Sequence, residues 1–291
     1  GDFSEDHRRK ELRQLLPKLE ELLTRMSSIK FLDPACGSGN FLIITYKELR
    51  RLEINILVKQ REIREALNEK AVYQGELLAD ASKISLSQFS GIELDDFAHE
   101  VARLSLYIAE HQMNVEMEEA LADVHPRLLP LREAGNIVCG NALRIDWETM
   151  LNAKEDDEVY IFGNPPYIGS KKMTLEQKKE LESVICSEIS SKKLDYISGW
   201  FYKATHLIYG KNAQYAFVTT NSINQGEQVS ILWNVLLRYG QISFAYQSFK
   251  WNNSAAHNAG VTVTIIGFSN KIDKKRIIYS DKGESYGKNI N

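Results

Sequence analysis

The sequence is poor in cysteine and histidine, the residues on which disulfide scaffolds and most structural zinc sites depend. Its 291 residues include three cysteines, Cys36, Cys139 and Cys186, which lie far apart and show no Cys-x-x-Cys spacing. The six histidines are equally scattered, and none forms a His-x-x-x-His pair. This pattern argues against a disulfide framework, and we expect no bound metal ion.

Long apolar runs are also missing. No stretch approaches the roughly 20 uncharged apolar residues that a membrane-spanning helix needs. The first residues lack the basic flank and apolar segment of a signal peptide. We therefore expect a cytoplasmic protein that does not contact a membrane. The chain begins with Gly1 instead of an initiator Met, which suggests that it was cut from something longer.

Positive charge is not in excess either. Acidic residues outnumber basic ones, and the formal net charge is −3. Proteins that bind nucleic acid on their own usually present a basic face to the phosphates. A DNA-binding function therefore requires that basic residues cluster locally or that another module supplies most of the affinity for DNA.

The chain does contain a regular alternation of helical patterns and short β-rich runs. Helices are predicted over 5–28, 40–70, 174–191, 195–209 and 226–238, and one more begins after its N-cap Asp95. Strands are predicted over 29–32, 91–94, 137–139, 159–162, 215–219, 242–246 and 261–266, and an irregular excursion over 71–86. This alternation favours an α/β fold with a mostly parallel sheet covered on both faces. The last two strands have no helix between them and should form an antiparallel pair.

A glycine-rich turn, Asp33-Pro34-Ala35-Cys36-Gly37-Ser38-Gly39-Asn40-Phe41, lies between the first predicted strand and the next helix. Glycines at such a turn let the backbone and the helix N–H groups approach a ligand closely. The dinucleotide-binding fingerprint requires a third glycine where this chain has Leu42. The Asp33 carboxylate would repel a pyrophosphate, and it suits a ligand that carries a cationic sulfonium.

Two further strand ends carry polar side chains. Glu93 stands where open α/β sheets present a carboxylate to ribose hydroxyls, and Ile92 and Leu94 beside it can hold an adenine ring. Glu93 follows Gly39 by 54 residues, against about 20 in the compact pattern, so the segment between them must loop out. Asn141 ends the third strand, where it either hydrogen-bonds the adenine amino group or only shapes the turn.

The tetrad Asn164-Pro165-Pro166-Tyr167 is the most informative stretch. The two prolines fix φ and remove two backbone donors directly after a strand. The Asn164 side-chain oxygen and the Pro165 carbonyl can accept the two hydrogens of an aromatic amine, so that its lone pair localises on nitrogen. Such positioning activates the amine without a strong base. Tyr167 offers a flat face to a base taken out of a duplex.

In this order, the glycine turn, Gly-Ile-Glu-Leu-Asp at 91–95, Gly-Asn-Ala at 140–142 and the tetrad resemble the class I amino-methyltransferases of the N6-adenine type. Residues 31–53, 249–253 and 258–263 look like the MmeI-type (type IIL) restriction–modification enzymes. The resemblance implies a Rossmann-like class I methyltransferase fold, with a seven-stranded, mostly parallel sheet and one antiparallel strand. The methyltransferase domain would cover 29–270. An N-terminal helix (1–28) would precede it, and a tail (271–291) would lead to a missing downstream domain.

The resemblance also implies the cofactor, the substrate and the residues that hold them. S-adenosyl-L-methionine would be bound by Asp33, Ala35, Gly37, Gly39, Asn40, Phe41, Glu93, Leu94, Asn141 and Ala142. An adenine flipped out of double-stranded DNA would be held by Asn164, Pro165 and Tyr167, with Phe249 or Trp251 stacked on its opposite face. Target-recognition and nuclease domains of the same parent would be the further partners.

Alternatives stay open at this point. The tetrad also resembles that of the glutamine N5-methyltransferases of release factors, and cytosine N4 methylation or a catalytically silent DNA-binding module are further readings. Core packing would equally explain Phe249 and Trp251. Four lysines follow the tetrad: Lys171, Lys172, Lys178 and Lys179. They either contact DNA phosphates or, as the favoured interpretation, are solvated helix charges balanced by Glu176 and Glu180.

Overall fold

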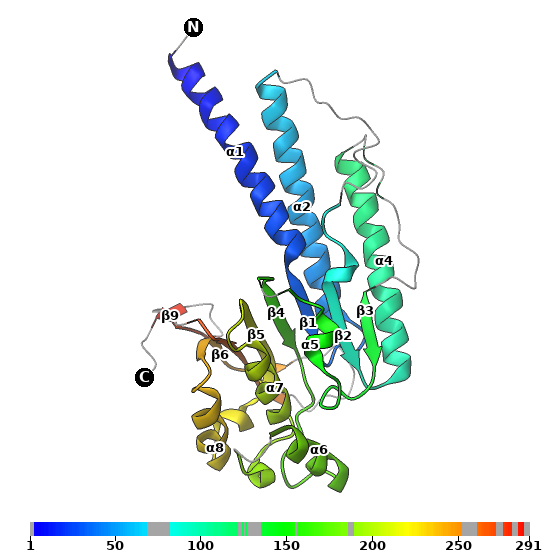
Figure 1. The fold of residues 1–291 in the computed structure, drawn as a ribbon, viewed down its shortest axis with the longest axis vertical. Coiled ribbons are helices and arrows are strands. Elements are labelled where there is room, and N and C mark those ends of the chain that lie inside the picture. Colours follow the sequence, from blue (N-terminus) through cyan, green and yellow to red (C-terminus); the bar gives the residue numbers. More distant parts are fainter. Residues whose placement is uncertain are drawn as a thin grey trace.

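A computed structural model of the chain describes residues 3–68, 82–121, 124, 126, 135–154, 156–185, 189–251, 261–271, 276–280 and 285–287. Figure 1 shows a twisted sheet with helices on both of its faces, and two long helices, α1 and α2, that extend well beyond the sheet. The alternation of strands and helices in the sequence thus corresponds to a three-layer arrangement.

The sheet has nine strands in the order β3-β2-β1-β4-β5-β7-β6-β8-β9. Their bounds are β1 Lys30–Asp33, β2 Phe89–Glu93, β3 Asn136–Cys139, β4 Val159–Gly163, β5 Ala213–Thr220, β6 Gln241–Trp251, β7 Val261–Ser269, β8 Ile277–Tyr279 and β9 Ser285–Gly287. The first five strands in this order are parallel. Strand β7 is antiparallel to both of its neighbours, β5 and β6, as the sequence predicts for the last two strands.

The helices divide into two layers. Their bounds are α1 Phe3–Ser28, α2 Asn40–Ala66, α4 Asp96–Ala120, α5 Trp147–Leu151, α6 Leu175–Ile185, α7 Ser198–Ile208 and α8 Glu227–Leu236. Helices α1, α2 and α4 share one apolar cluster with Phe31 and Phe89 of the sheet. Helices α5, α6, α7 and α8 share the other cluster, with Leu32, Ile92 and Phe217. Burial of both faces explains why the central strands read as continuous apolar runs.

Local side-chain bonds fix several helix starts. Asp95 caps α4 as predicted, because its carboxylate accepts a hydrogen bond of 2.8 Å from the Ala98 N–H. Asp146 caps the short α5, which the sequence analysis did not predict, through a bond of 3.0 Å from the Glu148 N–H. Five residues are too few for a periodic apolar pattern to stand out.

Two predicted helices end earlier than expected within the described residues. Helix α2 ends at Ala66 and α6 at Ile185. Residues 67–68 and 189–191 of these predictions are described and do not continue the α-helices. Residues 69–70 and 186–188, and residues 71–81 of the predicted excursion, lie outside the described residues. The segment after Asn270, treated above as a tail, contains β8, which pairs with β6, and β9, which pairs with β8. The sheet therefore has two strands more than the seven expected, and β9 is a second antiparallel strand.

The buried carboxylate of Glu53 on α2 binds the segment that leads into β2. Glu53 is fully buried and lies 3.1 Å from the guanidinium of Arg50. It accepts hydrogen bonds from the Ser82 hydroxyl (2.9 Å) and from the N–H groups of Lys83 (2.5 Å) and Ile84 (3.3 Å). Strand β2 begins a few residues later, so these bonds fix its point of entry.

In the part of the chain that the structure describes, no helix combines the length and the apolar character needed to cross a bilayer.

Candidate active site

The strand order reverses between β1 and β4, because the chain runs outward from β1 through β2 and β3 and then resumes on the other side of β1. Ligands of open α/β sheets bind at the carboxyl ends of strands beside such a reversal. The structure has a cleft of about 650 Å³ at this place, a size typical of small-molecule sites. Its described lining is Pro34, Ala35, Ile92, Glu93, Leu94, Gly140, Asn141, Ala142, Arg144, Asn164, Pro166, Ile168, Thr174, Glu176, Gln177, Glu180, Tyr196 and Trp200.

Glu93 ties the glycine turn to the start of α4. Its carboxylate accepts hydrogen bonds from the Gly37 N–H (2.8 Å) and from the Asp95 N–H (2.9 Å). Gly37 and Gly39 have φ values of +56° and +85°, in the left-handed region that favours glycine. The turn thus has a defined shape, and Leu94, which is 70% exposed, projects at its side.

Asp33 lies beneath the turn with no exposed surface. One carboxylate oxygen accepts a bond of 3.1 Å from the Ala35 N–H, and the other has no partner among the described residues. Burial raises the pKa of the Asp33 carboxyl to about 7, and the nearby Glu93 carboxylate adds to the rise. At Gly163 a Cβ would lie 2.4 Å from an Asp33 oxygen, so this position has no room for a side chain.

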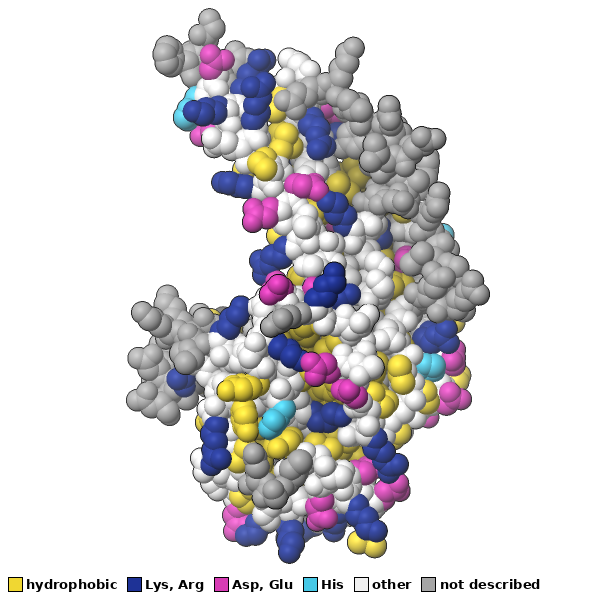
Figure 2. Space-filling model, in the orientation of Figure 1, with side chains coloured by type: hydrophobic (Ala, Val, Ile, Leu, Met, Phe, Trp, Pro, Cys, Tyr) yellow, Lys and Arg dark blue, Asp and Glu magenta, His cyan; other side chains and the backbone are white. Residues whose placement is uncertain are grey.

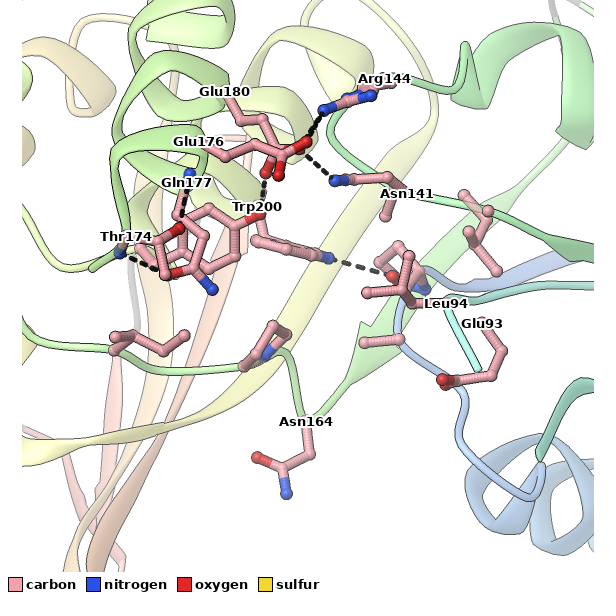
Figure 3. Close-up of a pocket in the computed structure, with 18 residues that line it drawn as sticks. Glu93, Leu94, Asn141, Arg144, Asn164, Thr174, Glu176, Gln177, Glu180 and Trp200 are labelled. Atoms are coloured by element: carbon pink, nitrogen blue, oxygen red, sulfur yellow. Dashed lines mark hydrogen bonds and ion pairs between the residues drawn. The ribbon is translucent and has the colours of Figure 1, made fainter. Parts of the chain in front are cut away.

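The far wall of the cleft is a polar group centred on Glu180 of α6. Its carboxylate accepts hydrogen bonds from Asn141 Nδ2 (2.9 Å), from Arg144 (2.6 Å) and from the Tyr196 hydroxyl (2.6 Å). The Asn141 side-chain oxygen accepts from the Leu143 N–H at 2.9 Å. Figure 3 shows Arg144 and Asn141 converging on Glu180 from the turn after β3. Burial alone would raise the Glu180 pKa, but these hydrogen bonds outweigh it and lower the pKa below its ordinary value.

Two side chains of α7 donate hydrogen bonds to the turns after β1 and β3. Trp200 donates its indole N–H to the Pro34 carbonyl at 3.0 Å, as Figure 3 shows. Lys203 donates to the carbonyls of Ala142 (2.9 Å), Leu143 (3.3 Å) and Ile145 (2.5 Å). Burial lowers the pKa of the Lys203 ammonium to about 8. These contacts hold the turns after β1 and β3 in position.

The tetrad leaves β4 at the edge of the same cleft. Asn164 and Pro166 line the cleft, and Pro165 is buried. The Asn164 side-chain oxygen is buried and has no hydrogen-bond partner among the described residues. In Figure 3 the amide projects from the turn after β4, away from the Glu180 group. Tyr167 is half-buried and packs against the apolar cluster of the α7 face.

The backbone after the tetrad is also fixed. Asp195 accepts a hydrogen bond of 2.9 Å from the Ile168 N–H, and the Tyr196 N–H donates to the Ile168 carbonyl at 3.0 Å. Both backbone groups of Ile168 are therefore satisfied by consecutive residues at the start of α7.

The predicted stacking residues lie on β6. Phe249 is half-buried and pairs in register with Val263, and Trp251 pairs with Val261. Phe249 is not part of the described cleft lining, and the Trp251 side chain lies outside the described residues. Their role in holding a base stays a prediction.

The predicted cofactor residues fall into two groups. Ala35, Glu93, Leu94, Asn141 and Ala142 line the cleft. Asp33, Gly37 and Gly39 shape the turn beneath it, Asn40 is the exposed first residue of α2, and the Phe41 ring lies 6.4 Å from that of Phe162. Sequence reasoning missed Arg144, Glu180, Tyr196 and Trp200, which no recognisable motif marks.

The lysines after the tetrad are all exposed. Glu176 and Glu180, the acidic residues expected to balance them, both pair with Arg144 instead, at 2.8 Å and 2.6 Å. On the face that Figure 2 shows, basic and acidic side chains are interspersed and form no continuous basic field. Among the described residues, no ion pair joins these four lysines to an acidic side chain.

Comparison with known proteins places this geometry in a family. A family model described as the MmeI DNA-methyltransferase domain matches residues 5–280. DNA methyltransferase A of Bacillus subtilis (strain 168) is 51% identical over 276 residues, which cover 94% of this chain and 30% of that protein. The structure of the type IIL restriction–modification enzyme MmeI in complex with DNA matches with a TM-score of 0.78 and 37% identity, over 96% of this chain and 36% of that one.

A more distant structure shares the fold alone. The ATP-dependent type ISP restriction–modification enzyme LlaBIII, bound to DNA, has a TM-score of 0.52 and 14% identity over 87% of this chain and 18% of that one. The chain spans about a third of the length of the two nearer relatives. The expected Rossmann-like class I methyltransferase fold is confirmed, and the chain belongs to the family of MmeI DNA-methyltransferase domains.

Proposed function

We propose that this domain transfers a methyl group from S-adenosyl-L-methionine to the N6 amino group of an adenine flipped out of double-stranded DNA. We further propose that it does so as part of a larger restriction–modification enzyme that carries target-recognition and nuclease domains. The observation that carries the proposal is the Asn164 side-chain oxygen, a buried acceptor at the edge of a nucleoside-sized cleft that has no hydrogen-bond partner among the described residues.

The residues of the cleft fit the proposed cofactor. Its volume of about 650 Å³ lies within the range of small-molecule sites. Glu93 and Asn141 supply oxygen acceptors suited to ribose hydroxyls and to an adenine amino group, and Leu94 and Pro166 supply apolar surface for the ring. The unpaired Asp33 oxygen suits a nearby cation, because a positive charge favours the ionised carboxylate.

When bound, the cofactor supplies an electrophilic methyl group on a cationic sulfonium. The chain's part is to position the amine. A buried oxygen without a donor costs free energy, so the Asn164 oxygen accepts a hydrogen from an incoming amino group readily. The Pro165 carbonyl is fixed by the ring of Pro166 and accepts the second hydrogen. Both bonds draw the nitrogen lone pair out of conjugation, and preorganised acceptors do this without reorganisation.

The lysines beside the tetrad support DNA as the substrate. A flipped base must be presented with its phosphates close to the catalytic turn, and exposed lysines that have no acidic partner among the described residues suit phosphate contacts there. The MmeI structure, which is 37% identical to this chain, was solved in complex with DNA. We propose that Lys171, Lys172, Lys178 and Lys179 contact the backbone near the flipped nucleotide.

The deciding experiment is the transfer of labelled methyl groups to a mixture of duplex DNA and bacterial protein extract, followed by nucleoside analysis. The proposal predicts label in DNA, recovered as N6-methyladenine. Label recovered as N4-methylcytosine would disprove the adenine assignment. Label confined to protein would disprove a DNA substrate and favour a glutamine side chain.

A further inference from the structure

Glu180 is a charged side chain that the proposed chemistry does not yet use. It lies on α6, beyond the tetrad, yet it lines the cleft and is only 8% exposed. Burial of a carboxylate is costly unless it is paired and hydrogen-bonded. Glu180 meets both conditions through Asn141 and Arg144 of the turn after β3 and through Tyr196, which precedes α7.

The bond to Asn141 has a chemical consequence. A side-chain amide has a donor end and an acceptor end, and an ionised carboxylate accepts hydrogen bonds only. Glu180 must therefore face the NH₂ group of Asn141, and the Leu143 N–H, which donates at 2.9 Å, must face its oxygen. The two contacts together define the orientation of the amide. Asn141 lines the cleft, and its oxygen has a second lone pair that can accept a hydrogen bond from a ligand there.

The other contacts of Glu180 keep it ionised and in place. Arg144 supplies a positive charge at 2.6 Å, and the Tyr196 hydroxyl donates to the second carboxylate oxygen at 2.6 Å. These hydrogen bonds lower the pKa of Glu180 although burial opposes them. Tyr196 also donates its N–H to Ile168, two residues after the tetrad's Pro166. Tyr196 thus holds both the Glu180 carboxylate and the backbone that follows the tetrad.

We infer that Glu180 is the specificity-determining residue for the purine of the cofactor. By holding the NH₂ group of Asn141, it keeps the amide oxygen as the acceptor for a ligand. The site then accepts a purine with an exocyclic amino group and rejects one with a carbonyl at the same position. This inference rests on the proposed function and names a residue that acts through Asn141 without touching the reacting atoms.

The test compares binding of two methyl-free probes, S-adenosylhomocysteine and S-inosylhomocysteine, which differ only in the amino group or carbonyl at position 6 of the purine. Isothermal titration calorimetry of the intact chain gives their ratio of dissociation constants. The inosyl probe would place a carbonyl, which has no hydrogen to donate, against the Asn141 oxygen, so we expect a ratio of roughly 10–100 in favour of the adenosyl probe. In the Glu180→Gln variant, whose amide can face Asn141 with either end, the ratio should fall by about fivefold or more.

A matched control variant lies one helical turn away. Glu176→Gln removes the same charge from α6 and a bond of the same kind to Arg144. Asn141 donates to Glu180 and not to Glu176, so this variant leaves the Asn141 bond in place. Its ratio should match that of the wild type. Tyr196→Phe removes the hydroxyl that holds the second oxygen of Glu180 without changing any charge, and its ratio should lie between those of Glu180→Gln and the wild type.

The outcomes are distinct. An equal fall in affinity for both probes, with the ratio unchanged in Glu180→Gln, would show that Glu180 is only structural and would overturn the inference while leaving the proposed function intact. An equal ratio change in Glu176→Gln would assign the effect to charge alone and would also overturn it. Failure of the wild-type chain to bind either probe would overturn the proposed cofactor, and the inference with it.

Discussion

The two ends of the cleft differ in how completely their polar groups are satisfied. At the cofactor end, Glu93 accepts two backbone hydrogen bonds, and Asn141 and Glu180 bond each other and their neighbours. At the tetrad end, the Asn164 oxygen is buried, and no residue that the structure describes donates a hydrogen bond to it. Satisfied polar groups define a shape, whereas an unsatisfied buried acceptor keeps its capacity for an incoming donor.

The difference corresponds to two tasks. A cofactor that must be selected among similar nucleosides benefits from acceptors whose orientation is fixed before binding. An amine that must be activated benefits from an acceptor that makes its strongest bond during the reaction. Substitutions at the two ends of the cleft should therefore have different effects.

The largest effect is expected from removing the unsatisfied acceptor. Asn164→Ala should lower the rate of methyl transfer to DNA by roughly 100- to 1000-fold, the usual cost of losing one preorganised hydrogen-bonding group. Affinity for S-adenosylhomocysteine should change by less than about threefold. Single-turnover assays and calorimetry check the two halves, with Asn224→Ala, an exposed position outside the cleft, as the control. Normal turnover in Asn164→Ala would contradict the proposed chemistry.

A smaller effect is expected where the acceptor is already satisfied. Glu93→Gln keeps the size of the side chain but can accept only through one oxygen, so the bond to Gly37 or to Asp95 is lost. We expect affinity for S-adenosylhomocysteine to fall by about 10- to 100-fold, because hydrogen bonds to charged groups are the strong ones. Asp96→Asn removes an exposed carboxylate from the same region and serves as the control. Unchanged affinity in Glu93→Gln would separate Glu93 from cofactor binding.

Asp33 stands between these two cases, because only one of its oxygens is satisfied. Its pKa is about 7 in the folded chain, against an ordinary value of 3.8. Between pH 5 and pH 7 the folded state therefore holds a proton that the unfolded state has lost, and stability falls as pH rises. Asp33→Asn keeps the bond to Ala35 and has no such titration. The free energy of unfolding of Asp33→Asn relative to that of the wild type should therefore rise by about 2 kcal/mol between pH 5 and pH 7.

Denaturant unfolding across pH 5 to 8 measures that difference. Asp146→Asn is the control, because hydrogen bonds from Thr149 and Glu148 lower the pKa of Asp146 and move its titration below this window. Its stability relative to the wild type should not change between pH 5 and pH 8. A flat difference for Asp33→Asn as well would show that Asp33 is ionised throughout.

The smallest effect is expected outside the cleft. Replacing Lys171 and Lys172 by Gln should reduce the salt dependence of DNA binding by up to about 2 in the slope of log affinity against log salt, because each phosphate contact contributes about 0.9. Replacing Lys10 and Lys18 of α1, also exposed, should leave the slope unchanged. Equal slopes for the two pairs would remove these lysines from the DNA interface.

Local patterns predicted much of this fold, and distant contacts account for what they missed. The Asp95 cap, the glycine turn and the proline tetrad depend on neighbours within a few residues, so their sequences indicate their conformations. Glu180 lies 39 residues from Asn141, and nothing in an ordinary helical pattern marks it as buried against that amide. Trp200 reads as core for the same reason, although it contacts the Pro34 carbonyl 166 residues away. The three-residue strands β8 and β9 are too short for an alternating pattern.

The buried carboxylate of Glu53 has a consequence for how this domain can vary. Its hydrogen bonds hold residues 82–84 against α2. The position of Glu93 therefore does not depend on the length of the segment that precedes residue 82. Additions or deletions ahead of residue 82 should therefore leave the strand that follows in place. The same anchor explains how Glu93, which follows Gly39 by 54 residues, still accepts a hydrogen bond from the glycine turn.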